Sequence, residues 1–97
     1  MDNDAMMLDV LGKSLLDVQT KFRMASIEDQ IALRQPLQQA LDNYATYQGK
    51  LLNDGIITTD ADLDQAKDIA AGIAAAADRQ SFLVVLGRVI AFIAPKI

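Results

Sequence analysis

The fold is decided by the stretch from Ser81 to Ile93, which reads SFLVVLGRVIAFI and carries one charge, Arg88. Its length and its lack of turn signals favour a helix over a strand. Pro95 is expected to end this helix, because the residue before a proline is pushed out of helical geometry. At about 3.6 residues per turn, the large apolar side chains share one broad face. That face comprises Phe82, Val85, Leu86, Val89, Ile90 and Ile93.

The opposite side of this helix is made of small residues and Arg88. A helix that is apolar nearly all round is buried in a core or covered by a partner chain. Either Arg88 reaches out of a core helix, or this side is an oligomer or partner surface. Two apolar residues near the N-terminus also fall off the main apolar seam of their segment. The candidate interaction surface is Val84, Gly87, Arg88, Ala91, Met6 and Val10.

The segments upstream are amphipathic and carry helix start and stop signals. Asp2 or Asn3 can cap a helix over about residues 4–24, in which apolar residues recur at three-four spacing. Thr59 with Asp62 predicts a capping box and a helix over about residues 60–77. Gly55 can adopt the left-handed conformation that ends the preceding helix. We expect the short connector of Ile56 and Ile57 to pack into the core.

Pro36 complicates the second quarter of the chain. Ser26 can cap a helix start, but a proline about ten residues into a helix costs about 3 kcal/mol or more. The apolar phase also changes, since Ile27 and Ile31 project to a different side from the later stripe. We therefore predict a short extra helix over about residues 27–34 and a longer one over about residues 36–52, with a single kinked helix as the alternative.

These elements predict an all-α fold. The fold class is a small antiparallel helical bundle of four main helices, over about residues 4–24, 36–52, 60–77 and 81–94, with the possible short helix near 27–34. A chain of 97 residues predicts a single helical domain, 1–97. Hydrophobic residues make up 52% and aromatic residues only 5%, so the core is expected to be aliphatic.

Charge and composition exclude several classes of function. The net charge is −4, and the nine basic residues are scattered, so we expect no nucleic-acid partner. Cysteine and histidine are absent, which removes thiol chemistry, the commonest metal ligands and the commonest general base. The acidic run that begins at Asp60 misses the calcium-loop pattern, because the sixth position is Gln65 and the twelfth is Ala71. We predict no catalytic residues, no cofactor and no metal site.

The sequence therefore predicts a small acidic protein–protein interaction module, such as an adaptor, inhibitor or assembly subunit. Its expected partners are itself, as a homodimer or larger assembly, and another protein. The first alternative is a membrane-associated protein that uses the apolar helix 82–93, although its charges make insertion costly. The second is a ligand-binding bundle with a cavity lined by Tyr44 and Tyr47 and a buried carboxylate. The cysteine-free composition and an N-terminus without a basic signal region predict a cytoplasmic location.

Overall fold

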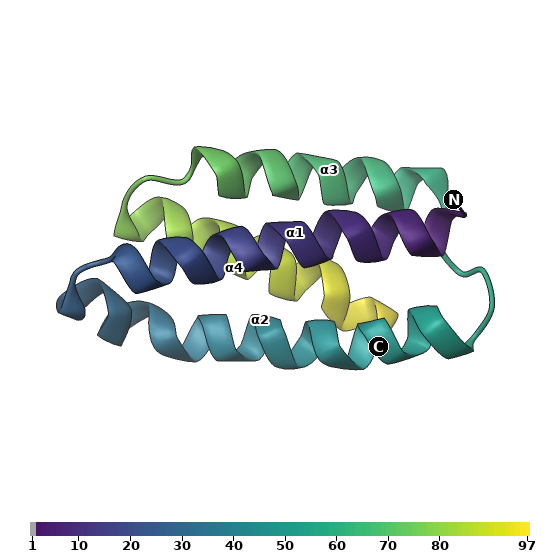
Figure 1. The fold of residues 1–97 in the computed structure, drawn as a ribbon, viewed down its shortest axis with the longest axis horizontal. Coiled ribbons are helices and arrows are strands. Elements are labelled where there is room, and N and C mark those ends of the chain that lie inside the picture. The colour runs from purple at the N-terminus through teal and green to yellow at the C-terminus, as the bar shows by residue number, and fades with distance from the viewer. Residues whose placement is uncertain (1) are drawn as a thin grey trace.

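The computed structural model describes residues 2–97 and confirms the all-α bundle. Its elements are α1 (Asn3–Met24), α2 (Ile27–Asn53), α3 (Asp60–Ala75), α4 (Arg79–Ile93) and a short 3₁₀ helix, η1 (Ala94–Lys96). The bundle is elongated, with principal extents of 41 × 21 × 19 Å. Consecutive helices run in opposite directions along the long axis (Figure 1).

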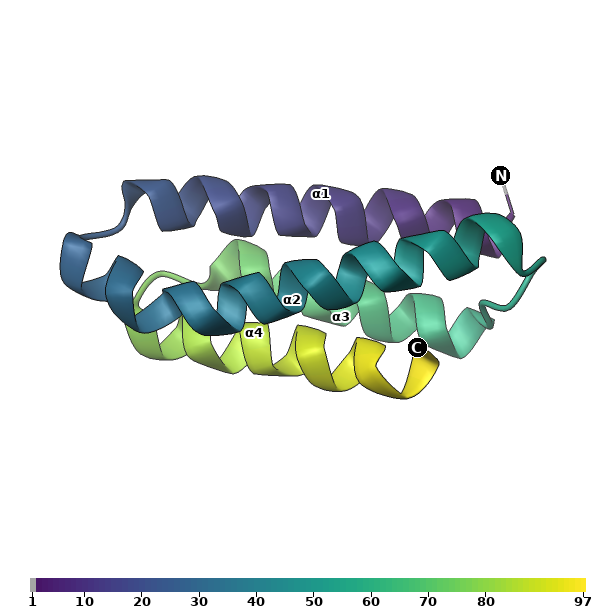
Figure 2. The same cartoon turned by 90° about the horizontal axis from the view of Figure 1, so that it is seen from below.

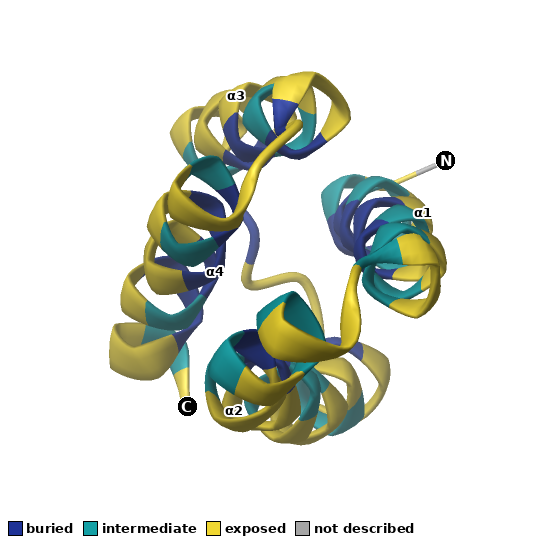
Figure 3. Cartoon of the chain, turned by 90° about the vertical axis from the view of Figure 1, so that its left-hand side faces the viewer, coloured by how far each residue is buried: buried dark blue, intermediate teal, exposed yellow. Residues whose placement is uncertain are grey.

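The order of the helices around the bundle differs from their order in the chain. Viewed end-on, α1 lies between α3 and α2, and α4 lies between α2 and α3 (Figure 3). Buried residues face the centre from all four helices. The most extensive packing joins α2 to α4 and α1 to α3, while α3 and α4 pack most sparsely among neighbouring helices. The two best-packed pairs therefore consist of parallel helices. Because α2 and α3 lie at opposite corners of the bundle, the loop that joins them runs diagonally across its end.

This arrangement gives the bundle two unlike ends (Figure 2). The crossover end comprises residues 2–5 and 52–62, where the diagonal loop runs past the first turn of α1. The turn end comprises residues 21–31 and 73–82, where two short turns join α1 to α2 and α3 to α4. Both α1 and α3 begin at the crossover end, so their acidic first turns lie at the positive ends of two helix dipoles. This placement explains the acidic run at Asp60 without a metal.

The predicted break at Pro36 is wrong, because α2 continues through the proline as a single helix. Proline removes one backbone donor, but Leu33 and Leu37 on either side of it are both buried in the same core. If the helix ended at Pro36, the buried residues on one side of the proline would no longer pack into the core. Ile27 and Ile31 are simply exposed, at 77% and 65%, so their different phase marks an outer face of α2 and no separate helix.

The apolar stretch behaves as predicted along one face of α4. Every residue of the predicted face is buried except Ile90, which is half-buried. Asp78 caps the helix two residues earlier than expected, and its carboxylate accepts a hydrogen bond from the Ser81 amide. The preceding helix, α3, ends at Ala75, two residues before the expected Ala77. Pro95 lies two residues beyond the end of α4, within η1.

The connector after α2 is the second correction. Gly55 has the expected positive φ of 79°. However, Ile56 is 72% exposed and Ile57 is also exposed, so the pair does not pack into the core. The buried residue of this loop is Thr58. A carboxylate, Asp4, holds the loop in place, and this polar anchor could not be recognised from hydrophobic patterning.

Candidate interaction surface

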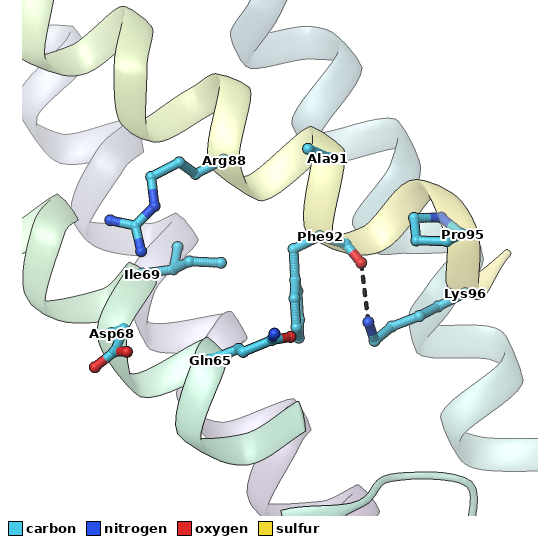
Figure 4. Close-up of a pocket in the computed structure, with 8 residues that line it drawn as sticks. All are labelled: Gln65, Asp68, Ile69, Arg88, Ala91, Phe92, Pro95 and Lys96. Carbon is cyan, nitrogen blue, oxygen red and sulfur yellow. Dashed lines mark hydrogen bonds between the residues drawn. The ribbon is translucent and has the colours of Figure 1, made fainter. Parts of the chain in front are cut away.

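A groove runs along the outside of the bundle between α3 and α4 (Figure 4). It has a volume of about 380 Å³. Its walls are Gln65, Asp68 and Ile69 from α3, and Arg88, Ala91, Phe92, Pro95 and Lys96 from α4 and η1. The groove exists because α3 and α4 are the most sparsely packed neighbours, and because most of the residues at its mouth are small or polar. Ile69 and Phe92 are buried and form its apolar floor.

Gly72 determines where Arg88 lies. A Cβ atom at Gly72 would come within 3.0 Å of Arg88 Nη1 and 3.4 Å of Val85 Cγ1. The guanidinium of Arg88 therefore extends from α4 across to the surface of α3 and occupies the space that a side chain at Gly72 would fill. Arg88 lines the groove and remains exposed, as is usual for a long side chain whose aliphatic part packs on the protein while its charge stays in water.

The charges that line the groove are incompletely paired. Within residues 2–97, neither Arg88 nor Asp68 forms an ion pair or a side-chain hydrogen bond. Lys96 is engaged: its Nζ donates to the Phe92 carbonyl at 3.1 Å and lies 3.9 Å from the centre of the Phe92 ring. It is also 3.7 Å from an Asp62 carboxylate oxygen. The lining thus holds one carboxylate and two cations in a chain whose net charge is −4.

The predicted interaction residues fall into two groups. Val84, Gly87, Arg88 and Ala91 are all exposed along the outward side of α4. Arg88 and Ala91 also line the groove, and nothing lies within 4 Å of a Cβ atom built at Gly87. Met6 and Val10 are half-buried and pack against the core, away from this surface. The structure thus brings the four α4 residues together on one face and separates the two α1 residues from them.

Sequence reasoning missed a second set of apolar residues, which lies at the two ends of the bundle. At the turn end these residues are Met24, Ile27 and Ile31, and at the crossover end they are Leu52, Ile56 and Ile57. All six are exposed. The one signal in the sequence was the phase of Ile27 and Ile31, which we interpreted as a helix break.

A buried polar cluster lies at the crossover end. The Asp4 carboxylate is 5% exposed and accepts hydrogen bonds from the amides of Ile57, at 3.2 Å, and Thr58, at 2.9 Å. Tyr47 is nearby, and burial is the largest cause of its raised pKa. Asp62 and Asp4 also raise this pKa, while Thr58 lowers it. Thr58 Oγ1 is buried, yet it makes no hydrogen bond of good geometry in the described part of the chain.

This cluster supplies the buried carboxylate that a ligand-binding bundle would need, but Asp4 is already committed to the loop. The Tyr44 hydroxyl donates to the Leu8 carbonyl at 3.4 Å, and burial raises the pKa of Tyr44. Neither tyrosine lines the α3–α4 groove. Smaller hollows lie at the turn end, beside Met24 and Phe82, and at the crossover end, beside Asp4 and Ile56, and neither tyrosine lines these. The tyrosines therefore act in packing between helices, as buried aromatic residues with a polar tip commonly do.

Among residues 2–97, no three His, Cys, Asp or Glu side chains converge as a metal site would require. Over the same residues, none of the helices combines the length and apolar character needed to span a bilayer. No family model matches the chain, and neither a curated protein nor a solved structure is significantly similar to it.

Proposed function

We propose that the protein is a non-catalytic protein–protein interaction module that self-associates through the α3–α4 face, defined as the groove together with Val84 and Gly87. The supporting observation is the combination of small exposed residues with unpaired charges of both signs around one groove. Small residues let another backbone approach closely. Charges of both signs allow one surface to complement a second copy of itself, as a two-fold contact requires.

Electrostatics favours this face over the rest of the surface for contact between copies. Two chains of net charge −4 repel each other on average, and this repulsion is weakest where cations lie. The groove holds Arg88, Lys96 and Asp68, and Lys96 is paired with Asp62, so this face is nearly neutral in a chain of net charge −4. A cytoplasmic location belongs to this proposal and rests on the cysteine-free composition.

The membrane-associated alternative has less support. It requires the large apolar face of residues 82–93, and those side chains are buried against the other helices. Attachment through that face would need the bundle to open, which would expose most of the core. The outward face that remains offers Val84 as its one large aliphatic residue on α4 within the described chain. That is little apolar area for a lipid contact.

The proposal is tested by solution mass across a dilution series, measured by light scattering and sedimentation equilibrium. We expect a concentration-dependent mass for the native chain. Ala91→Leu places a bulky side chain on the small outward strip and should weaken association. Ala45→Leu is the matched control, because Ala45 is also exposed in the middle of a helix, on α2.

Circular dichroism must show equal helix content in both variants before their masses are compared. A mass that stays monomeric at every concentration would contradict the proposal. Equal weakening by Ala91→Leu and Ala45→Leu would move the contact away from the α3–α4 face. Loss of association in Ala91→Leu alone would support it.

A further inference from the structure

We infer that the occupant of the groove is a second copy of the chain, related by a two-fold axis, so that Arg88 of each copy pairs with Asp68 of the other. This inference rests on the proposed self-association and specifies its geometry. It is carried by three features of the groove: the positions of the two charges, their lack of partners, and the apolar floor beside them.

The surface of α3 sets the positions of the two charges. The Arg88 guanidinium lies against Gly72, and Asp68 is four residues earlier on the same helix. Residues four apart on a helix are neighbours on one face, separated by about 6 Å along the axis. A cation and a carboxylate therefore lie about one turn apart along the same side of the groove (Figure 4). A two-fold axis that passes between them places each charge opposite its counterpart on the second copy.

Such a contact would improve the environment of both groups. Within residues 2–97, Arg88 and Asp68 are exposed and have no partner, and a second copy would supply one to each. The same docking would cover the edges of Ile69 and Phe92 that form the floor of the groove. Close approach is sterically possible on the α4 side, because Ala91 is small and nothing lies within 4 Å of a Cβ atom built at Gly87.

The size of the face predicts a weak dimer. A helix of 16 residues, such as α3, spans about 24 Å. With a bundle width of 19 to 21 Å, the footprint is on the order of 500 Å² per copy. Stable complexes bury roughly 800 Å² per partner. Dissociation in the micromolar range or weaker is therefore expected.

A charge-swap experiment tests the inference. The variants are Arg88→Asp, Asp68→Arg, the double variant, and an equimolar mixture of the two single variants, all measured by sedimentation equilibrium at low salt. Each single variant places like charges opposite each other in its own dimer, so dimerisation should weaken at least about tenfold. The double variant should recover. The mixture should form heterodimers, because one chain then carries two acidic groups and the other two basic groups at the contact.

Matched controls separate a local contact from a change in net charge. Arg34→Asp reverses an exposed cation on α2, and Asp64→Arg reverses an exposed carboxylate on α3 that does not line the groove. Neither should change dimerisation as the paired variants do. Circular dichroism should show native helix content throughout, since all four side chains are exposed.

The outcomes distinguish failure of the inference from failure of the proposed function. Recovery in both the double variant and the mixture would support the reciprocal pairs. Association that survives every variant would overturn the pairing and leave self-association standing. Weakening without recovery in the mixture would also overturn it, including the case in which Arg88 and Asp68 pair within one chain. A native chain that stays monomeric at all concentrations would overturn both proposals.

Discussion

The two ends of the bundle are stabilised by different kinds of polar contact. At the crossover end, a single buried carboxylate, Asp4, binds two loop amides. At the turn end, several side chains cap exposed helix termini: Lys21 and Gln30 each donate to carbonyl oxygens at the end of a neighbouring helix. Arg79 and Asp29 add an ion pair at 2.8 Å. The buried contact of the crossover end depends on Asp4, with Asn3 donating at the surface to the Thr58 carbonyl and to an Asp60 carboxylate oxygen. The turn end distributes its polar contacts over several side chains.

The difference follows from the topology. The diagonal loop crosses the end of the bundle, so the Thr58 amide is buried, the Ile57 amide is partly buried, and both need an acceptor inside the protein. The turns at the other end join adjacent helices and stay at the surface, where water can replace a lost partner. Substitutions at the crossover end should therefore cost more than substitutions at the turn end.

Asp4→Ala should produce the largest loss. The amides of Ile57 and Thr58 would lose their charged acceptor, and a buried unsatisfied donor costs about 1–3 kcal/mol. For the two amides together we expect about 2–4 kcal/mol, measured by urea unfolding. This is a large share of the roughly 5–15 kcal/mol that stabilises a domain. Asp4→Asn keeps one acceptor oxygen and should lose less. Equal losses in both variants would mean that the charge, and not the acceptor, matters.

Tyr47 should make the crossover end sensitive to alkali. Burial raises the pKa of Tyr47 above 10.0, so the unfolded chain ionises first as the pH increases. This contribution to stability is complete below about pH 10 and is lost as the pH rises through the folded pKa. As the pH rises from about 9 to about 11, the free energy of unfolding should therefore fall less in Tyr47→Phe than in the native chain. Parallel curves for the two proteins would refute this source of the pH dependence.

Lys21→Met should be the most damaging substitution at the turn end. Lys21 Nζ donates to three carbonyl oxygens at the end of α3, those of Ile73, Ala74 and Ala76, at 2.8, 2.9 and 3.3 Å. Its side chain is 28% exposed, so we expect a loss of about 1–2 kcal/mol. Lys13→Met is the control, since Lys13 is 77% exposed and its one ion pair within residues 2–97 is with Asp9. A loss at Lys21 no greater than at Lys13 would show that water replaces this cap.

Gly55→Ala tests the start of the diagonal loop. Its φ of 79° is strained for an L-residue, although nothing lies within 4 Å of an added Cβ. The cost should therefore be conformational, about 1 kcal/mol. Gly49→Ala makes the same chemical change inside α2, also with free space, and should stabilise by up to about 1 kcal/mol. Thermal unfolding should show shifts of opposite sign. A stabilising effect at both positions would mean that the loop relaxes.

The sequence predicted the helices well because their signals are local. Thr59 with Asp62, Ser26 and Asp2 all cap helices as their positions indicated. The apolar face of residues 82–93 followed from helical period alone. Pro36 was misjudged because a local penalty of about 3 kcal/mol was weighed without the buried residues on both sides of it.

The interaction surface was only partly predictable for the same reason. Helical period placed Gly87, Arg88 and Ala91 on one outward side, but the other wall of the groove comes from α3. Asp68 lies outside the apolar stripe of its own helix, so nothing in the sequence joined it to Arg88. Met6 and Val10 lie on a different helix, where they pack against the core, so their predicted role in an interaction stays a prediction. The order of the helices around the bundle decides which of these residues share a surface, and that order cannot be predicted from helical periodicity.

Asp78 at the turn end should give the smallest effect, and one of opposite pH dependence to Tyr47. The Ser81 amide and hydroxyl lower the pKa of the Asp78 carboxyl below 3.8 by hydrogen bonding. The contribution is therefore present above about pH 4 and is lost as the pH falls through the folded pKa. Asp78→Asn keeps a capping oxygen but cannot titrate, so it should flatten the acid side of the stability curve slightly. If Asp78→Asn instead changed the alkaline side, the assignment of acid sensitivity to the turn end and alkaline sensitivity to the crossover end would fail.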